Sequence, residues 1–250
     1  MSCISSLAKP VIALLMVSSA HAADMLTPMA PAAASAQAPW FELFGGGAVA
    51  PHSDYGYVGG TVAFNRDLQR EGWLFRASAG DGAYSYYSVP GLKRSVDFQT
   101  GDVAIGYQLL LSGIKISTFL GANVEQHAND DPFAEVRGAR GGAKGQVEIF
   151  APLTDFGYFY TLGSISSVWN NYLLLSKLGY RPSDRVSVGP ELLAMGNERY
   201  DGMRTGAFVS FAVTPSAEIT LSGGYSWDRR RNSLNDDSGA YTSLHLRSSF

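Results

Sequence analysis

From Trp40 to the C-terminus, apolar residues alternate with small or polar residues in short runs, and this two-residue period constrains the fold most strongly. Between Ile219 and Trp227, for example, every odd position is apolar, aromatic or glycine, and every even position is serine, threonine or glycine. Successive side chains of a β-strand point to opposite faces of the sheet. Each run therefore predicts a strand with one apolar face, and no helix of ordinary length stands out.

Twelve such runs follow one another along the chain. They span residues 40–50, 55–64, 73–83, 97–111, 114–126, 143–152, 157–166, 171–180, 186–195, 203–213, 217–227 and 240–250. Short connections, such as 112–113 and 214–216, alternate with longer polar ones: 84–96, 127–142 and 228–239. An even number of strands with short turns at one end and longer loops at the other is typical of bacterial outer-membrane barrels. The pattern predicts an all-β fold, an antiparallel up-and-down transmembrane β-barrel of about 12 strands, with both chain ends in the periplasm.

Two other interpretations compete with this one. Residues 103–122 are apolar enough for a transmembrane helix. Ser112-Gly113 interrupts that stretch, and both halves keep the two-residue period, so we predict a hairpin there. A secreted soluble β-barrel or sandwich would show the same alternation with its apolar face packed inward. The period alone does not say whether that face meets lipid or protein.

The N-terminus has the order of an export signal. Lys9 supplies a positive charge, residues 10–20 are mostly apolar, and Ala20-His21-Ala22 matches the small-x-small cleavage pattern. The only cysteine, Cys3, precedes the apolar stretch, so we predict no thiol chemistry and no disulfide in the mature chain.

We therefore predict a signal peptide over 1–22, a flexible Pro/Ala-rich lead-in over 23–39 and the barrel over 40–250. The last strand keeps its alternation up to the terminal Phe250, which resembles the assembly signal of outer-membrane barrels. Together these features predict the bacterial outer membrane as the location and its lipid as a partner.

Charged residues make up only 16% of the chain, and the net charge of −3 gives no basic field, so we predict no nucleic-acid partner. In a membrane barrel the charges must lie inside or at the rims. The predicted lumen-lining set is Arg76, Asp102, Lys115, Glu125, Lys144, Glu148, Lys177, Glu191, Arg204, Glu218 and Arg247. Both signs occur, so the set predicts either ion pairs that close the interior, which we favour, or a water-filled passage without one dominant sign.

Many aromatic residues fall near the ends of predicted strands, where membrane barrels carry interfacial girdles. The predicted girdle is Trp40, Phe41, Phe44, Tyr55, Tyr57, Trp73, Phe75, Tyr158, Tyr160, Tyr172, Tyr180 and Trp227. Five other aromatics fall in predicted outward loops, where lipid contact explains them less well. They are candidates for sugar contact: Tyr84, Tyr86, Tyr87, Trp169 and Tyr200.

The residues give little sign of catalysis. The mature chain has three histidines, His52, His127 and His245, in separate segments, and no motif for a serine hydrolase or a zinc site. The acidic stretch 129–135 lacks the EF-hand spacing. We therefore predict no enzyme activity, no cofactor and no metal site. An outer-membrane barrel hydrolase of lipid or polysaccharide stays as an alternative, with His127 as its candidate base.

Several motifs resemble, in order and spacing, those of one known family. Residues 40–46 (WFELFGG), 55–60 (YGYVGG) and 72–80 (GWLFRASAG) look like the opening hairpins of the BcsS family of cellulose biosynthesis proteins. The likeness continues through 102–108 (DVAIGYQ), 131–144, 196–199 (GNER) and 221–224 (LSGG), and it covers most of 40–250.

The resemblance implies an outer-membrane protein that assists the biosynthesis or export of bacterial cellulose, a β-1,4-glucan exopolysaccharide, as a conduit or as an accessory. It also implies β-1,4-glucan and other cellulose-export components as partners, and it supplies no catalytic residue. A structural or small-solute barrel without a polysaccharide role is the alternative.

Overall fold

A computed structural model describes residues 38–88, 92–131, 133–198, 200–230 and 238–250. The predicted signal peptide and residues 23–37 of the predicted lead-in lie outside the described residues. No helix in the described part of the chain is long and apolar enough to cross a membrane.

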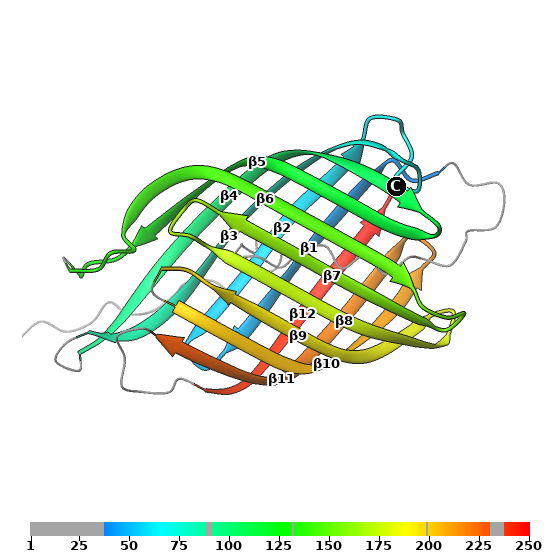
Figure 1. Cartoon of the computed structure of the whole chain (residues 1–250). Coiled ribbons are helices and arrows are strands. Elements are labelled where there is room, and N and C mark those ends of the chain that lie inside the picture. The colour runs from blue at the N-terminus through cyan, green and yellow to red at the C-terminus, as the bar shows by residue number, and fades with distance from the viewer. Residues whose placement is uncertain (1–37, 89–91, 132, 199, 231–237) are drawn as a thin grey trace, which may run out of the picture.

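Twelve antiparallel strands form a closed barrel, in which each strand pairs with its neighbours in the sequence and β1 pairs with β12 (Figure 1). The strands are β1 (Phe41–Ala50), β2 (Ser53–Ala63), β3 (Gly72–Ser88), β4 (Leu92–Leu111), β5 (Ile114–Ala128), β6 (Gly138–Pro152), β7 (Gly157–Ser166), β8 (Tyr172–Ser183), β9 (Val186–Gly196), β10 (Tyr200–Thr214), β11 (Ala217–Arg230) and β12 (Gly239–Ser249). The predicted fold class and strand number are confirmed.

The barrel has two distinct ends. The end that holds Phe41 and the C-terminus is called the terminal end, and it carries the connections 64–71, 112–113, 153–156, 184–185 and 215–216. The opposite end is called the loop end. In Figure 1 the C-terminus marks the terminal end on the right.

The turn between β4 and β5 confirms the predicted hairpin at 112–113. Ser112 has φ 50° and Gly113 has φ 87°, so both central residues lie in the left-handed region. Positive φ at both positions is the property of the type I′ turn, whose twist matches that of the flanking strands. The apolar stretch 103–122 therefore crosses as two strands.

Several strands extend further towards the loop end than the sequence predicts. Residues 84–96 are mostly a strand ladder, which runs from Tyr84 paired with Val96 to Ser88 paired with Leu92. Likewise β6 begins at Gly138 and β11 ends at Arg230. The predicted loops were too long because apolar alternation disappears once both faces of a strand leave the membrane, although the backbone ladder continues.

The outer surface of the barrel is apolar and the inner surface is mixed. Leu120 and Ile165 are 73% and 69% exposed on the outside, whereas Gln108, Glu148 and Lys177 are almost completely buried inside. A soluble barrel would bury the aliphatic face instead. This inverted arrangement is that of a transmembrane barrel, because its lipid-facing residues alternate with residues that face the lumen.

The predicted aromatic girdle is only partly correct. Trp40, Trp73 and Trp227 are exposed on the outside, as are Phe75 and Tyr180. In contrast, four predicted girdle residues are buried: Phe44, Tyr57, Tyr158 and Tyr160. The prediction used position along the strand and neglected the face, and Tyr158 and Tyr160 share the inward face of β7 with Leu162.

Candidate functional site

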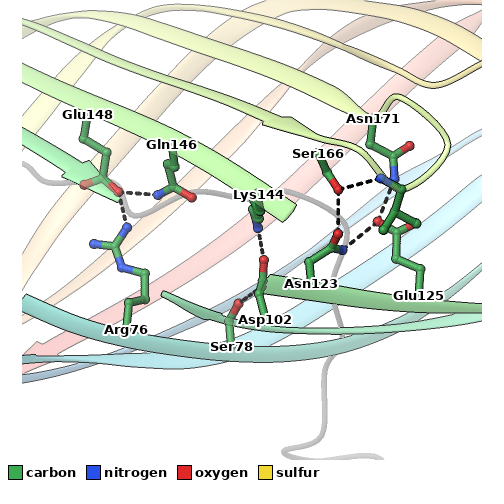
Figure 2. A network of polar contacts seen from close by, with 11 residues as sticks. Arg76, Ser78, Asp102, Asn123, Glu125, Lys144, Gln146, Glu148, Ser166 and Asn171 are labelled. Atoms are coloured by element: carbon green, nitrogen blue, oxygen red, sulfur yellow. Dashed lines mark hydrogen bonds and ion pairs between the residues drawn. The ribbon is translucent and has the colours of Figure 1, made fainter. Parts of the chain in front are cut away.

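The interior of the barrel near the terminal end is crossed by an ion pair. Arg76 on β3 bonds Glu148 on β6, although β4 and β5 lie between these strands in the wall (Figure 2). Arg76 also donates from Nε to Thr61 Oγ1 at 3.0 Å, and its guanidinium lies 3.8 Å from the centre of the Phe119 ring. Gln146 Nε2 donates to Glu148 Oε1 at 2.6 Å. The pair is therefore held by hydrogen bonds and by an aromatic face.

A second ion pair joins Lys144 on β6 to Asp102 on β4, and Ser78 donates to the same carboxylate (Figure 2). The remaining carboxylate in Figure 2, that of Glu125, accepts from Asn123 Nδ2 at 3.1 Å and from Asn171 Nδ2 at 2.6 Å.

Two further ion pairs lie along the inner wall between neighbouring strands. Lys177 Nζ lies 2.8 Å from Glu191 Oε2, and both side chains are almost fully buried. Arg247 bonds Glu42 where β12 meets β1. Most of the predicted lumen-lining cations thus have a carboxylate partner.

Apolar side chains fill the space between these pairs. One cluster contains Phe150, Tyr158, Tyr160, Leu162, Leu173, Leu175 and Phe208. Another consists of Ala63, Leu68, Leu74 and Phe119. Lys115 and Glu218, from the predicted lumen-lining set, lie partly buried close to the terminal end.

The connection 64–71 supplies Leu68 to this packing. Gln108, which is 1% exposed, donates from Nε2 to Leu68 O at 2.9 Å and to Arg70 O at 2.8 Å. Leu68 N donates to Pro39 O at 2.8 Å. The connection is therefore folded into the terminal end, whose described interior is packed with side chains except for a smaller space lined by Arg76, Asp102 and Lys144.

The interior near the loop end is hollow. A cavity of about 1230 Å³, its opening to solvent included, is lined by residues from β1 to β5 and from β8 to β12. We call this cavity the vestibule. Its deeper lining includes Glu191 and His245, and its lining near the loop end includes His52, Tyr84 and Tyr200.

One wall of the vestibule is aromatic. Phe98 stacks on Tyr55 with ring centres 5.7 Å apart and planes 6° apart, and on His127 with centres 5.3 Å apart and planes 12° apart. Tyr84 lies beside both Phe98 and His127, and its hydroxyl is 3.2 Å from His127 Nδ1. We call Tyr55, Tyr84, Phe98 and His127 the aromatic wall. Phe98 was not predicted, although its place at the start of an alternating run was a usable signal.

The structure places the predicted sugar contacts in different surroundings. Tyr84 and Tyr200 line the vestibule, but they lie on β3 and β10 and not in loops, so their predicted placement was wrong. Trp169 lies in a loop, is 3% exposed and packs edge-on against His127 at 4.7 Å, and it is not among the lining residues. Tyr87 also lies on β3, and its side chain lies outside the described part of the structure.

Tyr86 lies beyond the vestibule, on the part of β3 that pairs only with β4. Its hydroxyl donates to Asn129 Oδ1 at 3.1 Å and to Asp131 Oδ2 at 3.2 Å. Burial raises the pKa of this phenol, which therefore stays a neutral hydrogen-bond donor. Tyr86 thus fastens the extended β3–β4 hairpin to the loop between β5 and β6.

The wall opposite the aromatic one is polar, and we call Arg204, Asp228 and Tyr241 the polar wall. The Arg204 guanidinium lies 5.6 Å from the centre of the Tyr241 ring. Asp228 Oδ1 accepts from Tyr200 OH at 2.6 Å and from Ser226 Oγ at 3.0 Å. Tyr241 OH donates to Glu191 Oε1 at 3.2 Å.

His127, the candidate hydrolase base, has a neighbour at each ring nitrogen. Its Nδ1 faces Tyr84, and its Nε2 lies 3.5 Å from Glu125 Oε2. No serine or threonine hydroxyl among the described residues is a hydrogen-bond partner of His127. No group of three or more His, Cys, Asp or Glu side chains that could hold a metal ion occurs among them either.

Solved structures with a similar fold are outer-membrane proteins of low sequence identity. The KdgM porin in complex with disordered oligogalacturonate matches with a TM-score of 0.48 and 9% identity, over 84% of this chain and 99% of the porin. Omp33 of Acinetobacter baumannii matches with a TM-score of 0.41 and 12% identity, over 86% of this chain and 99% of Omp33. At these values the likeness carries no inference about function.

Comparison with curated proteins gives no match. The family model of cellulose biosynthesis protein BcsS, in contrast, matches residues 42–250, which is nearly the whole predicted barrel. The resemblance seen in the sequence is confirmed, and the chain belongs to the BcsS family of cellulose biosynthesis proteins.

Proposed function

We propose that this protein is a non-catalytic outer-membrane accessory of bacterial cellulose biosynthesis, and that its vestibule binds β-1,4-glucan at the cell surface. The observation that carries the proposal is the vestibule itself, which opens at the loop end above a terminal half filled by side chains. Membership of a cellulose biosynthesis family supports β-1,4-glucan as the ligand class.

The location follows from the shape of the barrel and from the N-terminus. Outer-membrane barrels keep short turns in the periplasm and direct longer loops outward. The terminal end has two-residue turns at 112–113, 184–185 and 215–216, which supports an orientation with this end in the periplasm and the vestibule outward. The predicted signal peptide over 1–22 supports export.

The vestibule combines the two surfaces that a sugar chain requires. The faces of a glucose ring are apolar and its edge carries hydroxyl groups, so ring faces pack on aromatic side chains and hydroxyls bond polar ones. The aromatic wall offers Tyr55, Tyr84 and Phe98, and the polar wall offers hydrogen-bonding groups across the cavity. A conduit would need an open lumen, so the filled terminal half favours an accessory role.

The direct test is calorimetric titration of the refolded, heat-modifiable protein with cellohexaose, with maltohexaose as the ligand control. We expect binding of cellohexaose and weaker binding of the α-linked maltohexaose. Phe98→Ala should weaken cellohexaose binding by about two- to tenfold, because one aromatic packing surface is lost. Phe133→Ala is the matched control, since Phe133 is fully exposed at the same end and does not line the vestibule. A folded wild-type protein that does not bind cellohexaose would contradict the proposal.

A planar-bilayer recording separates the accessory role from a conduit. The filled terminal half predicts that the folded protein conducts no steady current. A steady conductance that cello-oligosaccharides block would replace the accessory role with a conduit. Deletion of the gene should lower cellulose output, and unchanged output would instead support a structural or small-solute barrel.

A further inference from the structure

Arg204, in the polar wall of the vestibule, is a buried cation that has no carboxylate partner among the described residues. It is only 7% exposed, and in the described part of the chain its Nε has no hydrogen-bond partner. Its one polar contact among those residues is from Nη2 to Ser53 Oγ at 3.5 Å, the outer limit of a hydrogen bond. Arg76 and Lys177, by comparison, each bond a carboxylate.

Asp228, on the neighbouring strand β11, is an anion that complements the Arg204 cation. It is 4% exposed, and its hydrogen bonds come from the neutral hydroxyls of Tyr200 and Ser226. No cation among the residues whose side chains are described forms an ion pair with it. Gly202 lies between the partners, since a Cβ there would stand 2.2 Å from Tyr200 OH and 2.9 Å from Asp228 Oδ1. The glycine therefore leaves room for the bond that orients Asp228.

Arg204 and Asp228 line the same cavity and carry opposite charges. A guanidinium only donates hydrogen bonds and a carboxylate only accepts them. Leaving a buried charge without a partner is costly, so such a group in a cleft indicates a ligand site. A sugar hydroxyl both accepts and donates, so two adjacent hydroxyls satisfy an arginine and an aspartate together.

The charge of the lining restricts the kind of sugar. Asp54, Glu125, Glu191 and Asp228 line the vestibule, while Arg204 is the single lysine or arginine among the lining residues described. Carboxylates at short range repel one another, and the effect is larger where water is partly excluded. The lining therefore suits an uncharged sugar better than an acidic one.

We infer that Arg204 and Asp228 together bind two adjacent hydroxyl groups of a neutral glucan, and that Asp228 makes the vestibule reject glycans that carry carboxylates. The inference rests on the proposed function, because it assigns residues and specificity to the same glucan site. Arg204 donates to one sugar oxygen and Asp228 accepts from the neighbouring hydroxyl.

The test compares four folded proteins by calorimetry: wild type, Arg204→Met, Asp228→Asn and Asp97→Asn. Asp97 is the matched control because it is exposed on β4 near the same mouth and does not line the vestibule. The ligands are cellohexaose and a cello-oligosaccharide of equal length oxidised to carboxylates at C6. Heat modifiability on gels verifies that each variant is folded.

We expect Arg204→Met to weaken cellohexaose binding about tenfold or more, as for the loss of a charged hydrogen bond. The wild type should bind the neutral ligand more tightly than the oxidised one. Asp228→Asn should lower this ratio of affinities about tenfold, because it removes a negative charge. Asp97→Asn should leave both affinities unchanged. If the wild type fails to bind cellohexaose, the proposed function itself fails. If the wild type binds and Arg204→Met and Asp228→Asn behave like Asp97→Asn, only the present inference is overturned.

Discussion

Arg76 on β3 and Glu148 on β6 form an ion pair across the lumen, over the two strands that separate them in the barrel wall. Glu148 is 1% exposed, and the guanidinium of Arg76 lies between this carboxylate and the face of Phe119. The pair joins parts of the wall that the backbone ladder does not connect directly. The ion pair therefore links β3 and β6 through the interior of the barrel.

Removing either residue of this ion pair should destabilise the barrel strongly. Arg76→Met or Glu148→Gln leaves the other charge buried without its partner, which lowers the free energy of unfolding by about 3–5 kcal/mol. The double variant Arg76→Met/Glu148→Leu should lose much less than the sum of the two single variants, because no charge is left alone. Urea unfolding in phospholipid vesicles, followed by tryptophan fluorescence, measures all three. Single variants within about 1 kcal/mol of wild type would argue against a structural role for the pair.

The outward apolar surface gives a second prediction. Leu120 is 73% exposed and lies on the outward face of β5, so a membrane barrel places it against lipid. Leu120→Arg should then lower the free energy of unfolding in vesicles by about 2–4 kcal/mol, the cost of a cation facing the bilayer midplane. Phe133→Arg is the control, because Phe133 is 92% exposed in a loop and remains in water. If both variants lower the free energy of unfolding equally little, the result would indicate a soluble barrel.

The β4–β5 turn gives a third prediction. Gly113 has φ 87°, and a Cβ there would meet only Pro152 Cγ at an ordinary 3.6 Å. Gly113→Ala should therefore cost about 1–2 kcal/mol through backbone strain alone. Gly141→Ala is the comparison, since Gly141 lacks a positive φ and its Cβ would have space. The same vesicle unfolding assay measures both, and equal stabilities of the two variants would contradict the strain.

The sequence predicts the wall of this barrel well and its interior poorly, for a physical reason. A strand that faces lipid on one side must alternate, so the twelve strands and the hairpin at 112–113 can be read from local pattern. The pairing of Arg76 with Glu148 depends on closure of the barrel, which brings residues 72 positions apart into contact. No local pattern contains that information.

The same limit applies to the vestibule. Tyr84 and Tyr200 were predicted as candidate sugar contacts because they are aromatic and lie far from the predicted lipid band. Phe98 was missed although it begins an alternating run, because only the face of the strand, and not the position along it, separates an inward aromatic from a girdle residue. Arg204 was predicted to face the lumen, yet its lack of a carboxylate partner among the described residues emerges only from its three-dimensional neighbours.

The connection 64–71 carries the last prediction, because the Gln108 side chain bonds its backbone from inside the terminal end. Gln108 Nε2 bonds two backbone carbonyls of this connection, and Leu68 fills the space beside Leu74 and Phe119. Gln108→Ala removes both bonds and leaves two carbonyl groups without that donor, so the connection should open more often. Limited trypsin digestion, with mass spectrometry of the fragments, should then cut faster after Arg66 and Arg70 than in wild type.

Gln126→Ala is the control for this digestion, because Gln126 is exposed on β5 far from the connection. It should leave the cleavage rate at both arginines unchanged. Bilayer recordings of Gln108→Ala should show brief openings, since withdrawal of Leu68 unpacks one layer while Arg76 and Glu148 still cross the lumen. Cleavage rates identical to wild type would mean that packing of Leu68, rather than the two hydrogen bonds, holds the connection in place.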